Sequence, residues 1–217
     1  MKKINCDSIF NKKGYSVSLE FDPKDESWDE TKTNVVFTFS KKINGKEKIL
    51  HQEKLFSQFK NIEFIDFNGD GIKDILVENI SDVRSNLTYN LFIVDFKNQK
   101  LRKIEGFNEI KNPNYLEKYN LIDCVVMSGR NWTSFYKIEG NKVKDFGYVI
   151  KEGEDENGLD NYDIEYQKTL EKIIRSEKKL KPKNTDEKLH SNNPISLLQH
   201  LCHCTKEKET NASATNN

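Results

Sequence analysis

The sequence is poor in the residues that most often carry chemistry or covalent cross-links. Its 217 residues include only four histidines, four cysteines, four prolines and two tryptophans. The dispersed Cys6, Cys124, Cys202 and Cys204 do not suggest a disulfide scaffold, although Cys6 and Cys124 could pair. The His and Cys residues at 200–204 are too close together to close a zinc tetrahedron. The sequence therefore predicts neither a disulfide-stabilised fold nor a structural zinc site.

An excess of charge is also absent, since 35 Lys and Arg balance 35 Asp and Glu. This balance predicts no global field that would recruit nucleic acid or an anionic membrane. No apolar run approaches the roughly eighteen residues of a transmembrane segment, and Met1–Cys6 lacks the apolar core of a signal peptide. If the sequence is complete as given, it is expected to be a cytoplasmic protein. A leader that had already been removed would leave the same sequence.

Catalytic motifs are missing as well. His51 ends an expected strand, and the other three histidines lie near the C-terminus. No Gly-x-Ser-x-Gly elbow, phosphate-binding loop or His-Glu-x-x-His helix is present. Carboxylates are plentiful, so a paired-acid hydrolase stays open, but the prediction is a protein that is not an enzyme.

The most informative motif is a run of alternating oxygen-bearing residues that begins at Asp66. Ca²⁺ prefers roughly six to eight oxygen ligands, which alternate side chains of a turning loop can supply. The predicted ligands are the side chains of Asp66, Asn68, Asp70 and Asp74 and the backbone carbonyl of Ile72. Gly71 stands where the loop must bend sharply. The alternative is a solvated turn that binds no ion, because Asp, Asn and Gly favour turns for their own reasons.

The flanks of this loop distinguish it from an EF-hand. An EF-hand would place a bidentate glutamate at the twelfth position, where this chain has Val77, and would have helices on both sides. Here Ile62–Ile65 and Ile75–Val77 are short β-branched and aromatic runs. The sequence therefore predicts a calcium hairpin over residues 62–79.

Strand-like runs separated by turns recur from Tyr15 to about residue 150. About nine or ten strands are expected, among the runs at 15–21, 35–39, 49–50, 62–65, 75–77, 89–94, 101–104, 121–127, 132–138 and 143–149. Asn44-Gly45 between two such runs is a strong hairpin signal. This spacing predicts a mainly β, antiparallel domain over residues 1–152, and a sandwich, a barrel and a propeller-like arrangement remain open.

The pattern changes after residue 152. Apolar residues recur at intervals of three and four from Leu159 to Ile174, which predicts one amphipathic helix over 160–178. Residues 153–180 are therefore expected to be a linker and a C-terminal helix packed on the β domain. Residues 181–217 are rich in Lys, Asn, Thr, Ser and Glu and are predicted to be a disordered tail with an apolar island at Ile195–Leu201.

Two polar loops are candidate partner-binding sites. The first spans Ser81–Asn86 and contains Arg84, and the second consists of Ser128, Gly129, Arg130, Asn131 and Trp132. Arg and Trp are frequent anchors of protein interfaces, because Arg offers a planar fork and Trp buries a large area. The alternative is two ordinary turns, with Trp132 entering the core.

The order of several motifs resembles a family of calcium-binding, propeller-like bacterial envelope proteins. The resemblance covers residues 60–150 and rests on the loop at 66–74, Tyr89–Asp95, Asn112–Tyr115, Ser128–Arg130 and Phe135–Lys142. That family includes an immunity protein that guards Xanthomonas against its own type IV secreted peptidoglycan hydrolase. Its fold is similar to that of periplasmic lysozyme inhibitors.

The resemblance implies a stoichiometric inhibitor of a lysozyme-like glycosidase in the periplasm or cell envelope. In such inhibitors a Ser-Gly loop enters the enzyme cleft, and Ser128 and Gly129 match it. Arg130 would add a guanidinium that complements the two cleft carboxylates. A lipoprotein that has lost its leader would carry its lipid on Cys6. The alternative is an adhesion or carbohydrate-binding module of the integrin-like (VCBS) repeat type, although such modules carry several calcium loops, and 155–160 is a poor second copy here.

Overall fold

The computed structural model describes residues 1–24, 29, 31–153 and 160–180. These residues belong to one compact unit, Met1–Leu180. The predicted disordered tail at 181–217, the His and Cys residues at 200–204 and the weak second loop at 155–159 lie outside the described residues.

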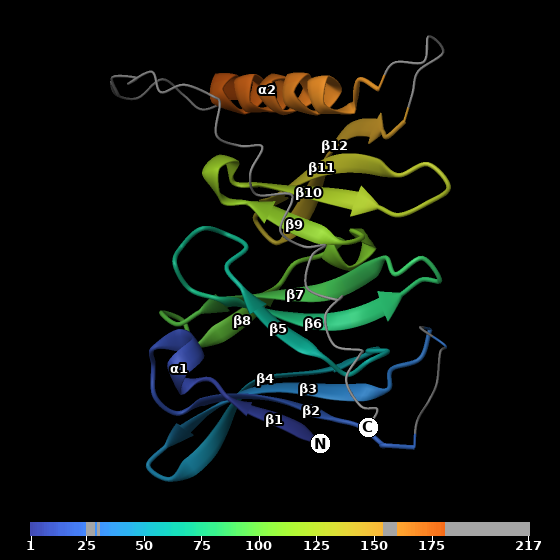
Figure 1. Ribbon diagram of the computed structural model, residues 1–217. Coiled ribbons are helices and arrows are strands. Elements are labelled where there is room, and N and C mark those ends of the chain that lie inside the picture. The colour runs from blue at the N-terminus through green and yellow to red at the C-terminus, as the bar shows by residue number, and fades with distance from the viewer. Residues whose placement is uncertain (25–28, 30, 154–159, 181–217) are drawn as a thin grey trace, which may run out of the picture. The chain divides into compact units, whose positions relative to one another are not determined.

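The compact unit contains three antiparallel sheets of four strands each, formed by consecutive strands (Figure 1). The first sheet has the order β1-β2-β3-β4, the second β5-β6-β7-β8 and the third β12-β11-β10-β9. The strands are β1 (Lys2–Asn5), β2 (Tyr15–Glu20), β3 (Val35–Ile43), β4 (Lys46–Leu55), β5 (Ile62–Ile65), β6 (Asp74–Ser81), β7 (Leu87–Asp95), β8 (Lys100–Lys103), β9 (Pro113–Leu116), β10 (Leu121–Val126), β11 (Trp132–Glu139) and β12 (Lys142–Lys151).

Helical segments are few. The helix α2 (Tyr162–Leu180) follows the third sheet, and the others are the single turns α1 (Asp7–Phe10), η1 (Phe107–Glu109) and η2 (Glu117–Tyr119). The mainly β prediction with one C-terminal helix is confirmed. Each sheet is a simple up-and-down meander, the arrangement of a propeller blade.

Three hydrophobic clusters hold the layers together. The first joins the β1–β4 sheet to the β5–β8 sheet through residues such as Phe37 and Phe92. The second joins the β5–β8 sheet to the third sheet through Leu91 and Ile122. The third lies between the third sheet and α2. Strand β7 is buried along nearly its whole length because both faces of its sheet are covered.

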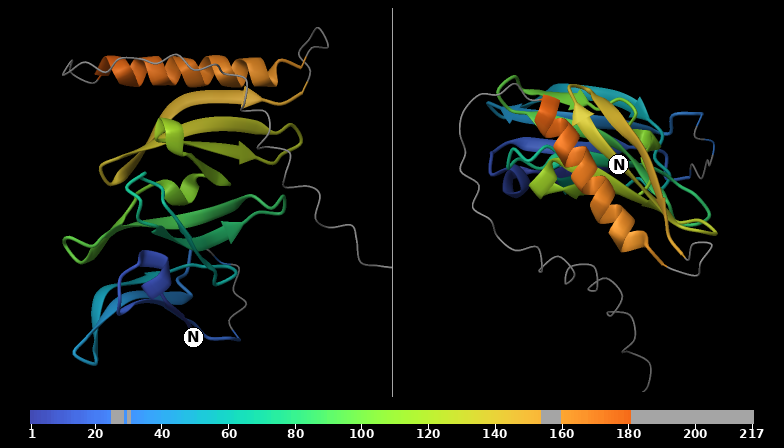
Figure 2. Two further views of the ribbon diagram at one scale, coloured as in Figure 1. Left: turned by 60° about the vertical axis from the view of Figure 1, so that its left-hand side comes forward. Right: turned by 90° about the horizontal axis from the view of Figure 1, so that it is seen from above.

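Helix α2 packs across the face of the third sheet that the other sheets leave open (Figure 2). Leu170 and Ile173 are buried there against Phe135. Polar contacts add to this packing, since the Tyr162 hydroxyl lies 2.6 Å from Thr133 Oγ1 and Lys137 contacts Glu177. The helix is therefore a fourth layer of the compact unit.

Two strands escaped the sequence-based prediction, and both lie at sheet edges. β1 is a four-residue strand at the edge of the first sheet, and β9 begins at Pro113 at the edge of the third. Proline is tolerated there because an edge strand needs fewer backbone donors. The Asn44-Gly45 hairpin is confirmed, with φ angles of 49° and 79° that suit a two-residue turn.

The two described cysteines are both free and buried. Cys6 belongs to the first hydrophobic cluster and Cys124 to the second, so the pairing left open above does not occur. Burial raises the pKa of the Cys6 thiol to about 11. In this fold the Cys6 side chain is not available to carry a lipid. Among the described residues, no helix is both long and apolar enough to cross a membrane.

Candidate functional site

The predicted calcium loop joins β5 to β6, which pair as an antiparallel hairpin with Ile65 opposite Asp74. The loop is therefore positioned by two strands, as the sequence predicts. Phe67 is buried in the second hydrophobic cluster and Ile72 packs against the first. The loop is thus anchored on both faces of the central sheet.

Side-chain oxygens in the loop are oriented by backbone amides. The Asp66 carboxylate accepts hydrogen bonds from the amides of Asn68, Gly69 and Gly71 at 3.1, 2.7 and 2.8 Å. Asn68 Oδ1 accepts one from the Asp70 amide at 2.9 Å, and Asp70 Oδ1 accepts one from the Ile72 amide at 2.8 Å. These repeated turns hold Asp66, Asn68 and Asp70 in one tight coil.

Gly71 has φ = +80°, a conformation that L side chains rarely adopt. The prediction that a glycine makes the bend is therefore confirmed at Gly71. Gly69 also has a positive φ, and a Cβ there would lie 2.9 Å from the Tyr115 hydroxyl. Tyr115 thus closes over the loop from β9, a contact that the sequence pattern does not predict.

Asp74 differs from the other loop carboxylates because it is fully buried. Its two oxygens accept hydrogen bonds from the amides of Phe67 and Val94, at 3.0 and 3.1 Å. Burial is the main cause that raises the pKa of Asp74 to about 7, and the charges of Asp70 and Asp66 contribute to the rise. The two amide hydrogen bonds act in the opposite direction and lower the pKa. Asp74 joins the loop to the centre of the sheet.

The donor set of this loop fits a hard cation, since it offers only carboxylate, amide and carbonyl oxygens. A carboxylate oxygen has two lone pairs. Asp66 Oδ1 uses both for amide hydrogen bonds, whereas Asp66 Oδ2 and Asp70 Oδ1 each accept one amide and keep a lone pair for a cation. Within residues 1–24, 29, 31–153 and 160–180, however, no three His, Cys, Asp or Glu side chains are grouped closely enough to hold a metal. Closing the loop on Ca²⁺ would require the carboxylates to move together.

The two predicted partner loops lie side by side, although about 40 residues separate them. We define the loop pair as residues 82–86, which connect β6 to β7, and residues 127–131, which connect β10 to β11. Asn86 is buried and joins the two loops, because its side chain donates to the Met127 carbonyl at 2.9 Å and accepts from the Met127 amide at 2.7 Å. Asn112 donates to Asn86 Oδ1 at 3.0 Å and to the Val125 carbonyl at 2.9 Å.

The first loop is ordered further by Asp82. Its carboxylate accepts hydrogen bonds from the Arg84 and Asn86 amides, and it forms an ion pair with Lys111 at 2.9 Å. The Lys111 ammonium, helped by Asn86, holds the pKa of Asp82 well below its usual range. At the tip, Val83 is fully exposed and Arg84 is exposed beside it.

The second loop is held against the end of β12. The Arg130 guanidinium donates to the carbonyls of Glu152 and Gly153, and Asn131 Nδ2 donates to Glu152 Oε2 at 2.8 Å. Ser128 contacts both Asn131 and Arg130. Met127 and Gly129 remain exposed, while Trp132 is half-buried against the second hydrophobic cluster.

The predicted calcium loop and the loop pair lie at opposite ends of the strands. The loop at 66–73 precedes β6 and the loop at 82–86 follows it, so the whole strand separates them (Figure 1). Calcium at Asp66–Asp74 would therefore not contact a partner bound to the loop pair. Its effect on binding would act through the stability of the central sheet.

Sequence reasoning missed how the loop pair is organised. Asn86 was predicted only as part of the polar loop at 81–86 and Asn112 only as part of a motif of the resemblance, and Glu152 was not singled out. Their significance arises from contacts between segments 13 to 41 residues apart, and a single sequence carries no signal for such contacts.

A buried carboxyl group outside both sites makes stability depend on pH. Glu78 on β6 is 5% exposed, and Glu63 lies near it with its carboxylate bonded to the Tyr89 hydroxyl at 3.1 Å. Burial raises the pKa of Glu78 from 4.5 to about 7, and the Glu63 charge adds to this rise. The sequence pattern does not predict this pair of carboxyl groups.

The Glu78 carboxyl therefore binds its proton more tightly in the folded protein than in the unfolded chain. This contribution to stability is complete below about pH 4.5 and is lost as the pH rises through about 7. The free energy of unfolding, measured with urea, should fall between pH 5 and pH 8. This fall should be about 2 kcal/mol smaller for Glu78→Gln than for the unaltered protein. Asp74 titrates in the same window and keeps part of the dependence. Equal losses in the two proteins would contradict the prediction.

Comparisons with protein families, with curated proteins and with solved structures found no match to this chain.

Proposed function

We propose that this protein is a calcium-stabilised binding protein, without catalytic activity of its own, whose loop pair contacts a protein partner. The observation that carries the proposal is the buried Asn86 bridge, which fixes two loops from different sheets as one surface. A surface ordered before binding loses little conformational entropy when the partner arrives. The exposed Val83, Met127 and Arg84 supply apolar area and a cation at its rim.

The partner class that best suits this surface is a lysozyme-like peptidoglycan hydrolase. A glycosidase cleft presents two carboxylates, which a guanidinium on a rigid loop complements. The resemblance to envelope inhibitors supports this class and a location in the periplasm or cell envelope. Because Arg130 is bound to the backbone carbonyls of Glu152 and Gly153, which follow β12, we assign it to bracing the loop and Arg84 to the cleft.

Arginine substitutions distinguish these two roles. Arg84→Ala should weaken binding by about 2 kcal/mol, roughly thirtyfold in Kd, without changing the free energy of unfolding. Arg130→Ala should reduce both the affinity for the partner and the free energy of unfolding, because it releases the second loop. Binding is measured by titration calorimetry and by turnover of purified peptidoglycan with a panel of lysozyme-like enzymes.

The matched control is Arg175→Ala, which removes an exposed arginine on α2. If no enzyme of the panel is inhibited by the folded, calcium-loaded protein at micromolar concentration, the hydrolase assignment fails. Binding to polysaccharide instead would favour the adhesion or carbohydrate-binding alternative.

Calcium should stabilise the fold through the 66–74 loop. An ion that binds only the folded state adds about 1.4 kcal/mol to the free energy of unfolding at ten times its Kd. Chelation should therefore lower the Tm, and Asp70→Ala should remove most of the response by deleting one ligand and one charge. Calorimetric titration with CaCl₂ measures binding directly.

Asp163→Ala is the control for this experiment, because it removes an exposed aspartate from the first turn of α2. It should leave the calcium response intact. A protein that takes up no calcium in the titration would refute the metal assignment, while inhibition of a hydrolase would still test the loop pair.

A further inference from the structure

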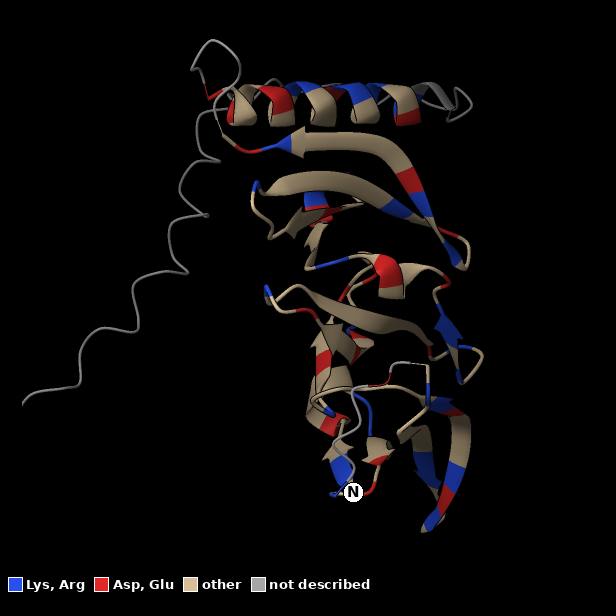
Figure 3. Ribbon diagram, turned by 90° about the vertical axis from the view of Figure 1, so that its right-hand side faces the viewer, with Lys and Arg blue, Asp and Glu red and all other residues tan. Residues whose placement is uncertain are grey.

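The charges that balance over the whole chain are not evenly distributed in the fold. Three segments at one end of the first two sheets carry eight lysines and three carboxylates: Lys12, Lys13, Lys41, Lys42, Lys46, Lys48, Lys97 and Lys100, with Asp7, Glu47 and Asp95. The segments are the turn around α1, the β3–β4 hairpin and the β7–β8 hairpin. Figure 3 shows lysine recurring along the projecting β3–β4 hairpin.

These three segments meet around a small aromatic cluster. The Phe96 ring, from the β7–β8 hairpin, lies 5.0 Å from that of Tyr15 and 5.3 Å from that of Phe10. Lys12 Nζ lies 5.1 Å from the Phe96 ring and Lys41 Nζ lies 4.9 Å from the Tyr15 ring. The lysines are therefore gathered on one surface.

The β3–β4 hairpin extends beyond the strands that flank it. β2 pairs with β3 only up to Lys41, whereas β3 and β4 stay paired out to Ile43 and Lys46. In this ribbon Lys41 lies directly opposite Lys48, a like-charge pairing that destabilises a hairpin. The neighbouring pair, Lys42 opposite Glu47, has opposite charges, so the ribbon carries four lysines and one glutamate around its turn.

Two isoleucines are exposed on the same ribbon. Ile43 is 39% exposed and Ile49 is 55% exposed. Strand alternation places them on opposite faces, with Lys41, Lys46 and Lys48 sharing the face of Ile43. Ile43 adjoins the turn and lies within the roughly 5–10 Å depth that interfacial segments reach in a bilayer, and Ile49 lies roughly 13 Å from Gly45 along the ribbon.

The three carboxylates of these segments are already engaged. Glu47 accepts hydrogen bonds from Lys3 and Ser40, Asp7 from the Gly14 amide, and Asp95 from Asn98. Their negative charges remain, and Glu47 lies opposite Lys42 in the ribbon, so eight lysines and three carboxylates leave five net positive charges on this surface.

We propose that the β3–β4 hairpin, with the lysines of the two neighbouring turns, docks on an anionic lipid surface. Lysines beside exposed isoleucines match a bilayer interface, where headgroups take the cations and acyl chains take the apolar side chains. The isoleucines argue against nucleic acid, because a phosphate backbone offers them no apolar contact. The aromatic rings here are also covered by lysines and are poorly placed to stack on bases.

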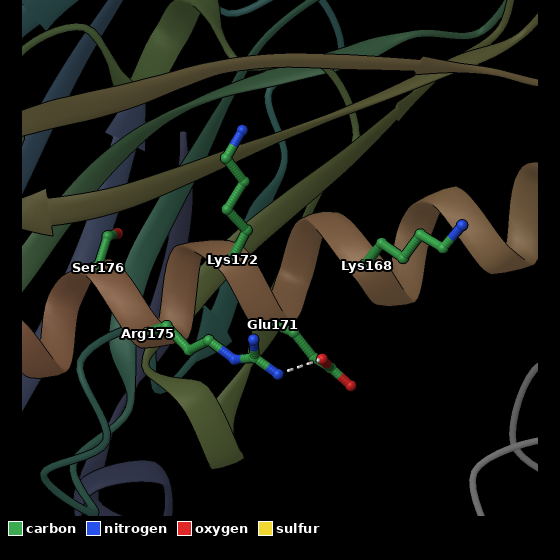
Figure 4. Close-up of a pocket in the computed structure, with 5 residues that line it drawn as sticks. All are labelled: Lys168, Glu171, Lys172, Arg175 and Ser176. Carbon is green, nitrogen blue, oxygen red and sulfur yellow. Dashed lines mark hydrogen bonds and ion pairs between the residues drawn. The ribbon is translucent and has the colours of Figure 1, made fainter.

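The outer face of α2 is a weaker candidate, although it also carries exposed cations. Figure 4 shows Lys168, Lys172 and Arg175 there, but Arg175 pairs with Glu171 at 3.1 Å. Lys172 lies over the Tyr148 ring. Since one of these cations is paired with Glu171 and another lies over an aromatic ring, α2 supplies control substitutions that match those in the hairpin.

The test is co-sedimentation of the full chain with phosphatidylcholine vesicles that contain or lack phosphatidylglycerol. Binding should occur only to the anionic vesicles and should weaken as salt is added. Lys46→Gln/Lys48→Gln should lower the partition coefficient roughly twenty-five-fold, about fivefold for each lysine. Ile43→Ser/Ile49→Ser should lower it by at least about tenfold.

Lys168→Gln/Lys178→Gln and Ile164→Ser make the same chemical changes on α2 and should leave binding unchanged. Absence of binding to anionic vesicles would overturn the proposal. So would loss of binding in the α2 variants instead of the hairpin variants. Binding to duplex DNA that depends on the lysines and not on the isoleucines, without binding to vesicles, would assign the hairpin to a different polyanion.

Discussion

Replacing Phe135 with alanine is expected to lower the free energy of unfolding by about 4 kcal/mol. Phe135 is fully buried on β11, between the third sheet and α2. Its ring lies 5.1 Å from that of Tyr166 on the helix. Large-to-small substitution at such a site removes the transfer free energy of the ring and leaves a cavity that the neighbouring layers fill only partly.

Urea unfolding followed by circular dichroism measures this loss. Phe59→Ala is the matched control, because Phe59 is 56% exposed and its removal should change the free energy of unfolding by less than about 0.5 kcal/mol. If Phe135→Ala cost no more than this control, α2 would not be packed on the sheet as a structural layer.

The position of α2 also shows how far sequence patterns reach. Apolar residues at intervals of three and four predict the helix and the face that it buries, since Leu170 and Ile173 are the residues found in the interface. The pattern does not identify the partner of that face. The hydroxyl of Tyr166 donates to buried Asp123 Oδ2 at 2.6 Å, a contact between residues 43 positions apart. Only the fold brings these two groups together.

A similar limit applies to strands and charges. The central strands were predictable because Val, Ile, Leu and Phe recur in them, whereas the edge strands β1 and β9 are short and partly polar. Overall composition predicted a chain without a global electrostatic field, but the net charge does not show where the charged residues lie in the fold. The sheet register places Lys41 opposite Lys48 and concentrates cations at one hairpin.

The candidate site was predictable where its chemistry is local. The loop at 66–74 is contiguous, so its hairpin and its glycine bend could be inferred from spacing, and its binding of calcium stays a prediction. The loop pair is assembled from two segments. The sequence predicts each loop separately, but it does not predict the Asn86 hydrogen bonds that join them. That bridge supplies the remaining prediction.

Asn86→Ala is expected to lower the free energy of unfolding by about 3 kcal/mol. The Asn86 side chain is 2% exposed and bonds the Met127 amide, the Met127 carbonyl, Asp82 and Asn112. Truncation leaves several of these partners without a hydrogen bond, and each buried unsatisfied group costs roughly 1–3 kcal/mol. Asn108→Ala, at an exposed position in η1, should have an effect of less than about 0.5 kcal/mol.

The same substitution tests whether the loop pair acts as a unit. If Asn86 aligns the two loops, Asn86→Ala should accelerate amide hydrogen exchange at Met127 and in residues 82–86. No amide should exchange more slowly. Partner affinity should fall together with this loss of protection, because the loops must then be ordered during binding. Unchanged exchange at Met127 would mean that the two loops hold their positions independently, and the preformed surface on which the proposed function rests would have no basis.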